Sequence, residues 1–125
     1  MSELKYDKQH EWVRVEGDVA VIGISQFAQD QLGDVVYVDL PKEGDAVVAG
    51  ETFGEIESVK SVSELYAPVS GEIVKVNDAL GDTPEIVNAD PLGEGWMIHV
   101  RLEDPSQVDA MMSADEYEAY VTEGA

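Results

Sequence analysis

The sequence has no cysteine, and only seven of its 125 residues are lysine or arginine. Without cysteine the chain can form no disulfide framework, no thiol nucleophile and no thiolate metal site. The few basic residues lie scattered among 27 acidic ones, so they form no basic patch of the kind that nucleic-acid binding requires. The longest apolar runs are far shorter than a membrane span. Neither nucleic acid nor a membrane is therefore an expected partner.

Targeting signals are also absent from the start of the sequence. The first seven residues contain no apolar signal core, and they lack the arginine-rich, acid-poor character of a transit peptide. We therefore expect a cytoplasmic protein of a prokaryotic cell, which needs no import into an organelle.

Negative charge is abundant, and the formal net charge is −20. The acids alternate with valine, isoleucine and leucine instead of forming a tail, so the chain is expected to fold. With 125 residues and no linker-like stretch, one domain over residues 1–125 is expected, as a monomer. The acidity has two compatible interpretations: it keeps the protein soluble, or it steers docking onto basic partner surfaces.

Short apolar segments separated by glycine, proline and aspartate turns predict a mostly β protein. Ser25 and Gly33 predict the start and end of a short helix that follows the first hairpin. A capping box that begins at Ser113 predicts a helix near the C-terminus, after another that starts near Pro105. Many short strands with such turns favour a sandwich or flattened barrel. The expected strands cover residues 11–15, 19–24, 34–40, 46–48, 52–57, 62–66, 72–77 and 96–102, and the helices 26–32, one turn near 84–87, and the tail.

The sequence contains few residues that could form a catalytic site. His10 and His99 lie in or beside expected strands, and no nucleophile motif accompanies them. The sequence contains no calcium-binding loop, no His-Glu-x-x-His motif and no phosphate-binding glycine loop. The residues by themselves therefore argue against an enzyme, and a hydrolase that uses Glu and His has no constellation in its favour. No metal site is expected.

Lys60 is the only cation between Lys42 and Lys75. It lies between two short expected strands, at the tip of a hairpin. A lysine there can be a solvated turn residue, or it can be acylated by a modifying enzyme and serve as a swinging arm on a rigid base. The residues alone leave both interpretations open.

Several segments of the sequence resemble segments of one protein family, and they occur in the same order as in that family. The segment 57–73, ESVKSVSELYAPVSGEI, resembles the lipoylation region of the glycine cleavage system H-protein family. Further blocks that are similar to this family cover residues 10–13, 23–41, 87–91 and 92–97. The resemblance implies the fold of that family. It is a lipoyl-type barrel-sandwich hybrid of two antiparallel sheets, with C-terminal helices.

The resemblance also implies that Lys60 carries lipoate in an amide linkage. Glu57, Val59 and Ser61 flank this lysine, and the enzyme that attaches lipoate would read them. Ser61 stands where the family often has alanine. Biotin carriers, an alternative class, favour methionine on both sides of the modified lysine, and Val59 and Ser61 weaken that interpretation.

Four more residues match positions that the family or its relatives use. Gly44 lies sixteen residues before Lys60 and Gly71 eleven after it, where related lipoyl domains tend to have glycine. Tight turns at these glycines would expose the hairpin. Glu11 and Glu64 match positions that the family places near the loaded arm, where carboxylates would hold its cationic amine. Glu64 stands where the family more often has aspartate.

The implied function is a carrier without an active site of its own. In the family's cycle a pyridoxal-phosphate glycine decarboxylase loads an aminomethyl group onto the lipoyl arm. An aminomethyltransferase passes the methylene group to tetrahydrofolate, and dihydrolipoyl dehydrogenase restores the disulfide. Some proteins of this type are instead relays that pass lipoyl groups to other enzymes, and the sequence does not separate the two roles.

Overall fold

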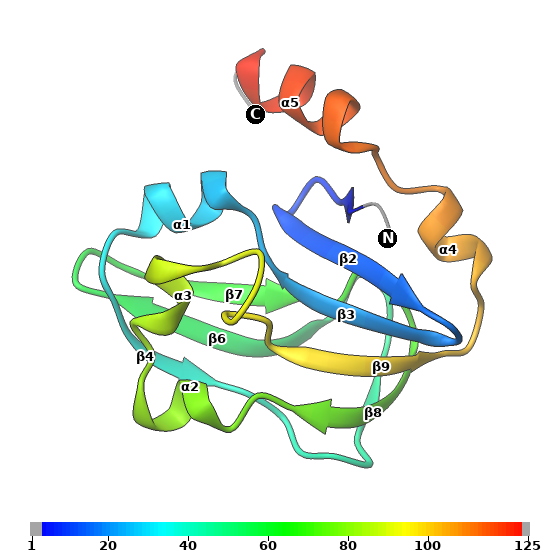
Figure 1. Ribbon diagram of the computed structural model, residues 1–125, viewed down its shortest axis with the longest axis horizontal. Helices are drawn as coiled ribbons and strands as arrows, with labels where there is room; N and C mark the ends of the chain where they lie inside the picture. The colour runs from blue at the N-terminus through cyan, green and yellow to red at the C-terminus, as the bar shows by residue number, and fades with distance from the viewer. Residues whose placement is uncertain (1–3, 124–125) are drawn as a thin grey trace.

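The computed structural model describes residues 4–123 as two antiparallel β-sheets that enclose one main core (Figure 1). The larger sheet has the strand order β1-β2-β3-β9-β8-β5, and the smaller sheet has the order β4-β6-β7. The strands are β1 (Lys5–Tyr6), β2 (Glu11–Glu16), β3 (Val19–Ile24), β4 (Val35–Asp39), β5 (Ala46–Val47), β6 (Thr52–Ser58), β7 (Val62–Tyr66), β8 (Gly71–Val76) and β9 (Ile98–Leu102). The helices are α1 (Gln26–Leu32), α2 (Ala79–Asp82), α3 (Ile86–Ala89), α4 (Ser106–Asp109) and α5 (Ala114–Thr122). The predicted fold class is confirmed.

The first hairpin and the helix after it form as the sequence predicts. β2 and β3 pair in register around a turn in which Gly17 has a φ of 68°. The Ser25 hydroxyl then accepts a hydrogen bond from the Ala28 backbone N–H at 3.1 Å and so caps α1. Gly33 ends the helix at a φ of 77°, which a residue with a side chain adopts only with strain. The end of this helix lies next to the hairpin turn that carries Lys60.

Alternating apolar residues on the inner faces of both sheets form the core. Ile22, Ile73 and Ile98 come from the larger sheet, and Ile56 and Leu65 come from the smaller one. All five are 0–1% exposed. Burial of each such side chain stabilises the fold by roughly 2 kcal/mol. The core therefore holds the small sheet, which carries Lys60 on its hairpin, firmly against the large one.

Two short elements lie where no regular structure is expected from the sequence. The strand β1 pairs with β2, and the helix α2 precedes the turn expected near 84–87, which forms as α3. Both elements are too short for a periodic pattern to reveal them. Their positions are set by pairing with β2 and by the buried side chain of Leu80.

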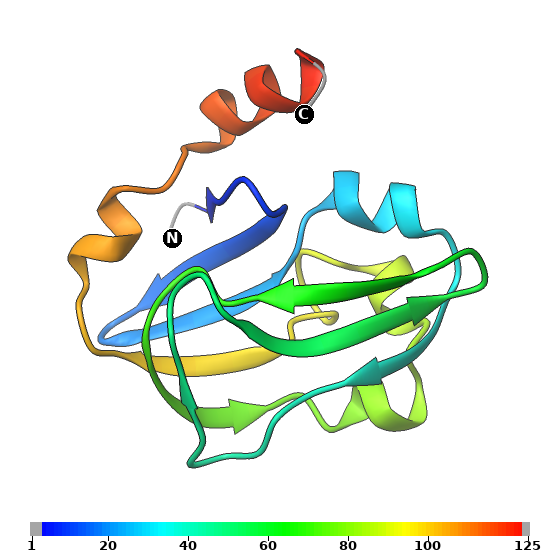
Figure 2. The same cartoon turned by 180° about the vertical axis from the view of Figure 1, so that it is seen from behind.

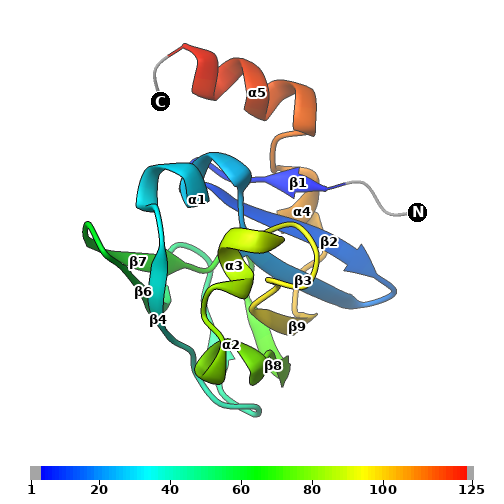
Figure 3. The ribbon, with the colours of Figure 1, turned by 60° about the vertical axis from the view of Figure 1, so that its left-hand side comes forward.

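The C-terminal segment returns to the start of the chain. The backbones of Tyr6 and Met112 exchange two hydrogen bonds, of 2.8 and 2.9 Å, and the rings of Tyr6 and Tyr117 stack with centroids 4.4 Å apart. The capping box joins Ser113 and Glu116, as the sequence predicts. The helix α5 consequently lies above α1 and β1, away from the β6–β7 hairpin (Figure 3).

Gly44 lies just before β5 and Gly71 is the first residue of β8, so neither belongs to the Lys60 hairpin. Gly44 has a φ of 93°, as a tight turn requires. Gly71 has no positive φ, so the expectation of a turn glycine does not describe it. A side chain is excluded at Gly71 because a Cβ would collide with the Arg101 carbonyl oxygen and lie 2.7 Å from Val100 Cγ1.

Replacing Gly71 with valine is therefore expected to reduce the free energy of unfolding by roughly 3 kcal/mol, because β8 must move away from β9. Gly81→Ala is the matched control, since a Cβ there meets no atom within 4 Å. Urea unfolding monitored by circular dichroism measures both variants. Equal midpoints for the two would contradict the packing argument.

Candidate functional site

Lys60 lies in the tight turn between β6 and β7, with an exposed side chain. Ser58 organises this turn: its hydroxyl accepts hydrogen bonds from the backbone N–H groups of Lys60 and Ser61, each at 3.1 Å. The Ser58 N–H also donates to the Ser61 carbonyl oxygen at 2.8 Å. The turn that carries the lysine is therefore held by the Ser58 side chain and by a backbone hydrogen bond.

The hairpin turn is attached to the loop between α1 and β4, which runs beside it (Figure 2). The Val59 N–H donates to the Asp34 carbonyl oxygen at 3.0 Å. The Lys60 stem lies over Gly33, where an added Cβ would come 3.3 Å from the lysine Cε. A glycine at this position thus leaves room for the lysine side chain.

The side chain of Asn88 holds the loop between α1 and β4 through two hydrogen bonds. Its Nδ2 donates to the Gly33 carbonyl oxygen at 2.7 Å, and its Oδ1 accepts from the Val35 N–H at 2.8 Å. Asn88, Gly33 and Ser58 are site residues that the sequence by itself does not indicate. A serine before a turn is a usable local signal, but Asn88 is more than fifty residues from its partners.

The three flanking residues expected from the sequence surround the lysine. Val59 is 66% exposed, Ser61 is exposed and Glu57 is half-buried near the end of β6. Among residues 4–123, no ion pair involves Lys60. Its amine is therefore available for covalent attachment of an acyl group.

Glu64 lies on β7 and Glu11 begins β2, and Tyr66 at the end of β7 contacts both. The Tyr66 N–H donates to Glu11 Oε2 at 3.2 Å, and the Tyr66 hydroxyl donates to Glu64 Oε2 at 3.1 Å. Glu64 is exposed, whereas Glu11 is only 2% exposed. From Val62 to Tyr66 the strand covers roughly 13 Å, so Glu11 is remote from the Lys60 backbone.

The Glu11 carboxyl group is in an unusual electrostatic environment. Burial raises the pKa of Glu11 to about 11, and a hydrogen bond with the Asp7 carboxylate adds to the rise. Within the described residues Glu11 Oε1 has no hydrogen-bond partner, which adds to the cost of burying this group as a carboxylate. The structure thus places a neutral, buried carboxyl group at the start of β2.

A polar network next to Glu11 holds the β1–β2 loop. His10 has a φ of 71°, and its Nδ1 lies 2.7 Å from the Tyr117 hydroxyl, which also lies 2.7 Å from the Ser25 hydroxyl. Burial lowers the pKa of His10, and the negative charge of Asp7 raises it by a smaller amount. A neutral histidine tied to α5 in this way positions a loop, and the Ser25 hydroxyl of the network is buried and caps α1.

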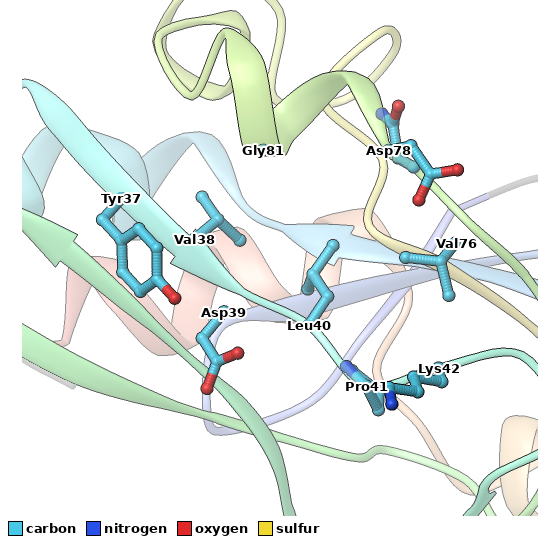
Figure 4. Close-up of a pocket in the computed structure, with 10 residues that line it drawn as sticks. Tyr37, Val38, Asp39, Leu40, Pro41, Lys42, Val76, Asp78 and Gly81 are labelled. Atoms are coloured by element: carbon cyan, nitrogen blue, oxygen red, sulfur yellow. The ribbon is translucent and has the colours of Figure 1, made fainter.

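A cavity of about 360 Å³ lies between the end of β4 and α2 (Figure 4). Val38, Leu40 and Val76 supply its apolar wall, and Asp39 and Lys42 stand at its rim. Neither Lys60 nor Glu11 lines it. In residues 4–123 no three histidine or acidic side chains gather as a metal site, and no helix is long and apolar enough to cross a membrane.

Comparison with known proteins identifies the family of this chain. Residues 4–124 match the glycine cleavage H-protein family. The glycine cleavage system H protein of Halalkalibacterium halodurans is 58% identical over 122 residues, which cover 98% of this chain and 95% of that one. The H protein of Staphylococcus carnosus is 54% identical over 121 residues, covering 97% and 96%.

A solved structure extends the likeness to three dimensions. The crystal structure of the glycine cleavage system H protein from Mycobacterium marinum superposes with a TM-score of 0.88 at 39% identity, covering 98% of both chains. The sequence matches and this superposition extend over nearly the whole chain. The chain therefore belongs to the glycine cleavage H-protein family.

Proposed function

We propose that this protein is the lipoyl carrier of a glycine cleavage system and that lipoate is attached to Lys60. Membership of the H-protein family supports the carrier role. The observation that carries the assignment to Lys60 is its exposed amine, without an ion pair in residues 4–123, on a hairpin turn that Ser58 and Asp34 hold in place. When bound, lipoate supplies a cyclic disulfide that accepts a carbon group or electrons.

The carrier takes the aminomethyl group from the glycine decarboxylase to the aminomethyltransferase, and it passes electrons to dihydrolipoyl dehydrogenase. It has no reaction centre of its own, and residues 1–125 act as one monomeric carrier domain. The family match over residues 4–124 supports a single domain. The bacterial origin of the two relatives supports a prokaryotic, cytoplasmic setting.

Glu64 and Glu11 hold the cationic amine of the loaded arm. Glu64 is exposed on β7, the strand that begins just after the Lys60 turn, and can meet the amine first. Glu11 is buried and neutral until a cation approaches, because its pKa is raised to about 11. A positive charge close to this carboxyl group favours its ionisation with release of the proton to solvent, so that the arm's cation and the carboxylate form a pair.

Reconstitution tests the proposed role. The lipoylated protein is mixed with the decarboxylase, the aminomethyltransferase, the dehydrogenase, tetrahydrofolate, NAD⁺ and glycine labelled in its carboxyl carbon. We expect glycine-dependent release of labelled CO₂ and NADH formation that both require this chain. If the chain is lipoylated but supports neither, and captures only lipoyl transferases from a lysate, it is a relay and not a glycine cleavage carrier.

A further inference from the structure

Exposed large hydrophobic side chains gather around Lys60. Five such residues are found in the part of the chain that the structure describes, and four of them stand at this end of the small sheet. Exposed apolar side chains that gather in one region of a protein surface mark contact sites. We call these four the apolar collar: Val36, Tyr37, Val59 and Val62, which are 51%, 50%, 66% and 58% exposed.

The strand geometry explains how the collar forms. A register shift between Val35 and Tyr37 interrupts the pairing of β4 with β6. Regular alternation would turn one of two successive residues inward, but here Val36 and Tyr37 are both exposed. Tyr37, Glu57 and Val62 then lie directly opposite one another across the three strands, on the outer face of the sheet.

The next outward-facing row on the same face is acidic. Asp39 pairs with Glu55, and Glu55 pairs with Glu64, so three carboxylates stand side by side across β4, β6 and β7. None of them forms an ion pair with another described residue. Like charges directly opposite each other destabilise a sheet. A partner that brings positive charge to this row would relieve the repulsion.

We propose that the apolar collar and the acidic row behind it form the docking surface for the enzyme that attaches lipoate to Lys60. The partner's chemistry follows from the surface: an apolar rim around its active-site entrance, with lysine or arginine side chains beside it. This inference rests on the proposed lipoylation of Lys60. The argument for this particular occupant is the short reach of the unmodified side chain.

An unmodified lysine extends only about 6 Å from its Cα to Nζ. Here that side chain also lies back over Gly33, with its Cε 3.3 Å and its Nζ 3.8 Å from where a Cβ would be. An enzyme that acylates Nζ must therefore press against the turn and cover the collar. Lipoate roughly doubles the reach of the Lys60 side chain. Enzymes that act on the lipoylated arm therefore meet its far end and depend less on contact with the collar.

Initial rates of lipoylation by the purified attaching enzyme test the collar. We expect Val59→Ser with Val62→Ser to lower kcat/KM at least tenfold, mainly through KM, since each side chain loses its apolar contact in the complex. Val48→Ser is the matched control because Val48 is also 50% exposed but lies outside the collar. Urea unfolding and circular dichroism establish that all variants are folded.

A second variant pair tests the acidic row. Asp39→Asn with Glu55→Gln should lower kcat/KM at low salt and flatten its decline as salt increases, because screening no longer removes an attraction. The control pair, Asp109→Asn with Glu118→Gln, removes two exposed acids elsewhere. It should keep the salt dependence of the wild type.

The outcomes separate this inference from the proposed function. If mass spectrometry finds no lipoyl group on Lys60 of the wild type, the proposed function fails and the docking surface fails with it. If Lys60 is lipoylated and the collar variant keeps the wild-type kcat/KM, only the docking surface is wrong. The same conclusion follows if Val48→Ser lowers kcat/KM as much as the collar variant does.

Discussion

Replacing Lys60 with arginine is expected to abolish lipoyl attachment and glycine cleavage activity completely. A guanidinium group stays protonated in proteins and offers no nucleophilic amine, although it preserves the charge. The side chain is exposed, so the free energy of unfolding should change by no more than about 0.5 kcal/mol. The intact mass of the protein expressed in lipoylating cells gives the first measurement, and reconstituted CO₂ release gives the second.

The controls for this experiment are Lys42→Arg and Lys75→Arg. Lys42 lines the cavity between β4 and α2, and the Lys75 amine lies 5.5 Å from the centre of the Trp96 ring. Both variants should keep a lipoyl group on Lys60 and full activity. A lipoyl adduct that persists in Lys60→Arg, or that maps to another lysine, would show that the hairpin turn is not the attachment site.

Replacing Glu11 with glutamine is expected to change how stability depends on pH. The unfolded chain releases this proton near the ordinary value of 4.5, while the folded protein holds it up to about 11. Between these values the folded state binds more protons, so the free energy of unfolding falls as pH rises. The stabilisation is complete below the unfolded pKa and is lost as the pH approaches the folded one.

Glutamine has nearly the same shape and does not titrate. Its amide oxygen can accept from the Tyr66 N–H, and its amide nitrogen can donate to the Asp7 carboxylate. Between about pH 5 and about pH 8, the stability of Glu11→Gln relative to the wild type should therefore increase by about 1 kcal/mol per pH unit. Urea unfolding at several pH values measures this difference.

Glu64→Gln is the control for Glu11→Gln, because it removes one carboxylate in the same way at an exposed position. A Glu11→Gln protein whose stability runs parallel to the wild type across this pH range would mean that Glu11 is ionised in the fold. The buried carboxyl group would then need a cationic or hydrogen-bonding partner other than Asp7.

Most of the elements near Lys60 could be predicted from local sequence. The cap at Ser25, the end of α1 at Gly33 and the hairpin that carries Lys60 all depend on residues close together in the chain. Glu11 and Glu64 could be named only through the resemblance to a family. Their different environments could not be inferred, because burial depends on which strands cover a residue.

The remaining site features involve residues that are distant in the chain. Asn88 reaches Gly33 and Val35 only because α3 packs under the loop between α1 and β4. The collar depends on the register shift in β4, and no local pattern in Val35, Val36 and Tyr37 reveals it. The expected turn at Gly71 was wrong because Gly71 is a strand residue that pairs with Val47 and Leu102, and the Arg101 carbonyl oxygen excludes a side chain there.

The sequence by itself determined the class of fold, the hairpin with its single lysine and the family, since turns, caps and apolar alternation are encoded in neighbouring residues. The tertiary structure decided that Glu11 is buried beside Asp7 and that Lys60 lies over Gly33. It also decided that the apolar collar and the acidic row are both exposed at the small sheet. These properties depend on desolvation and on the approach of segments far apart in the chain. The desolvation and these long-range contacts arise only when the two sheets pack.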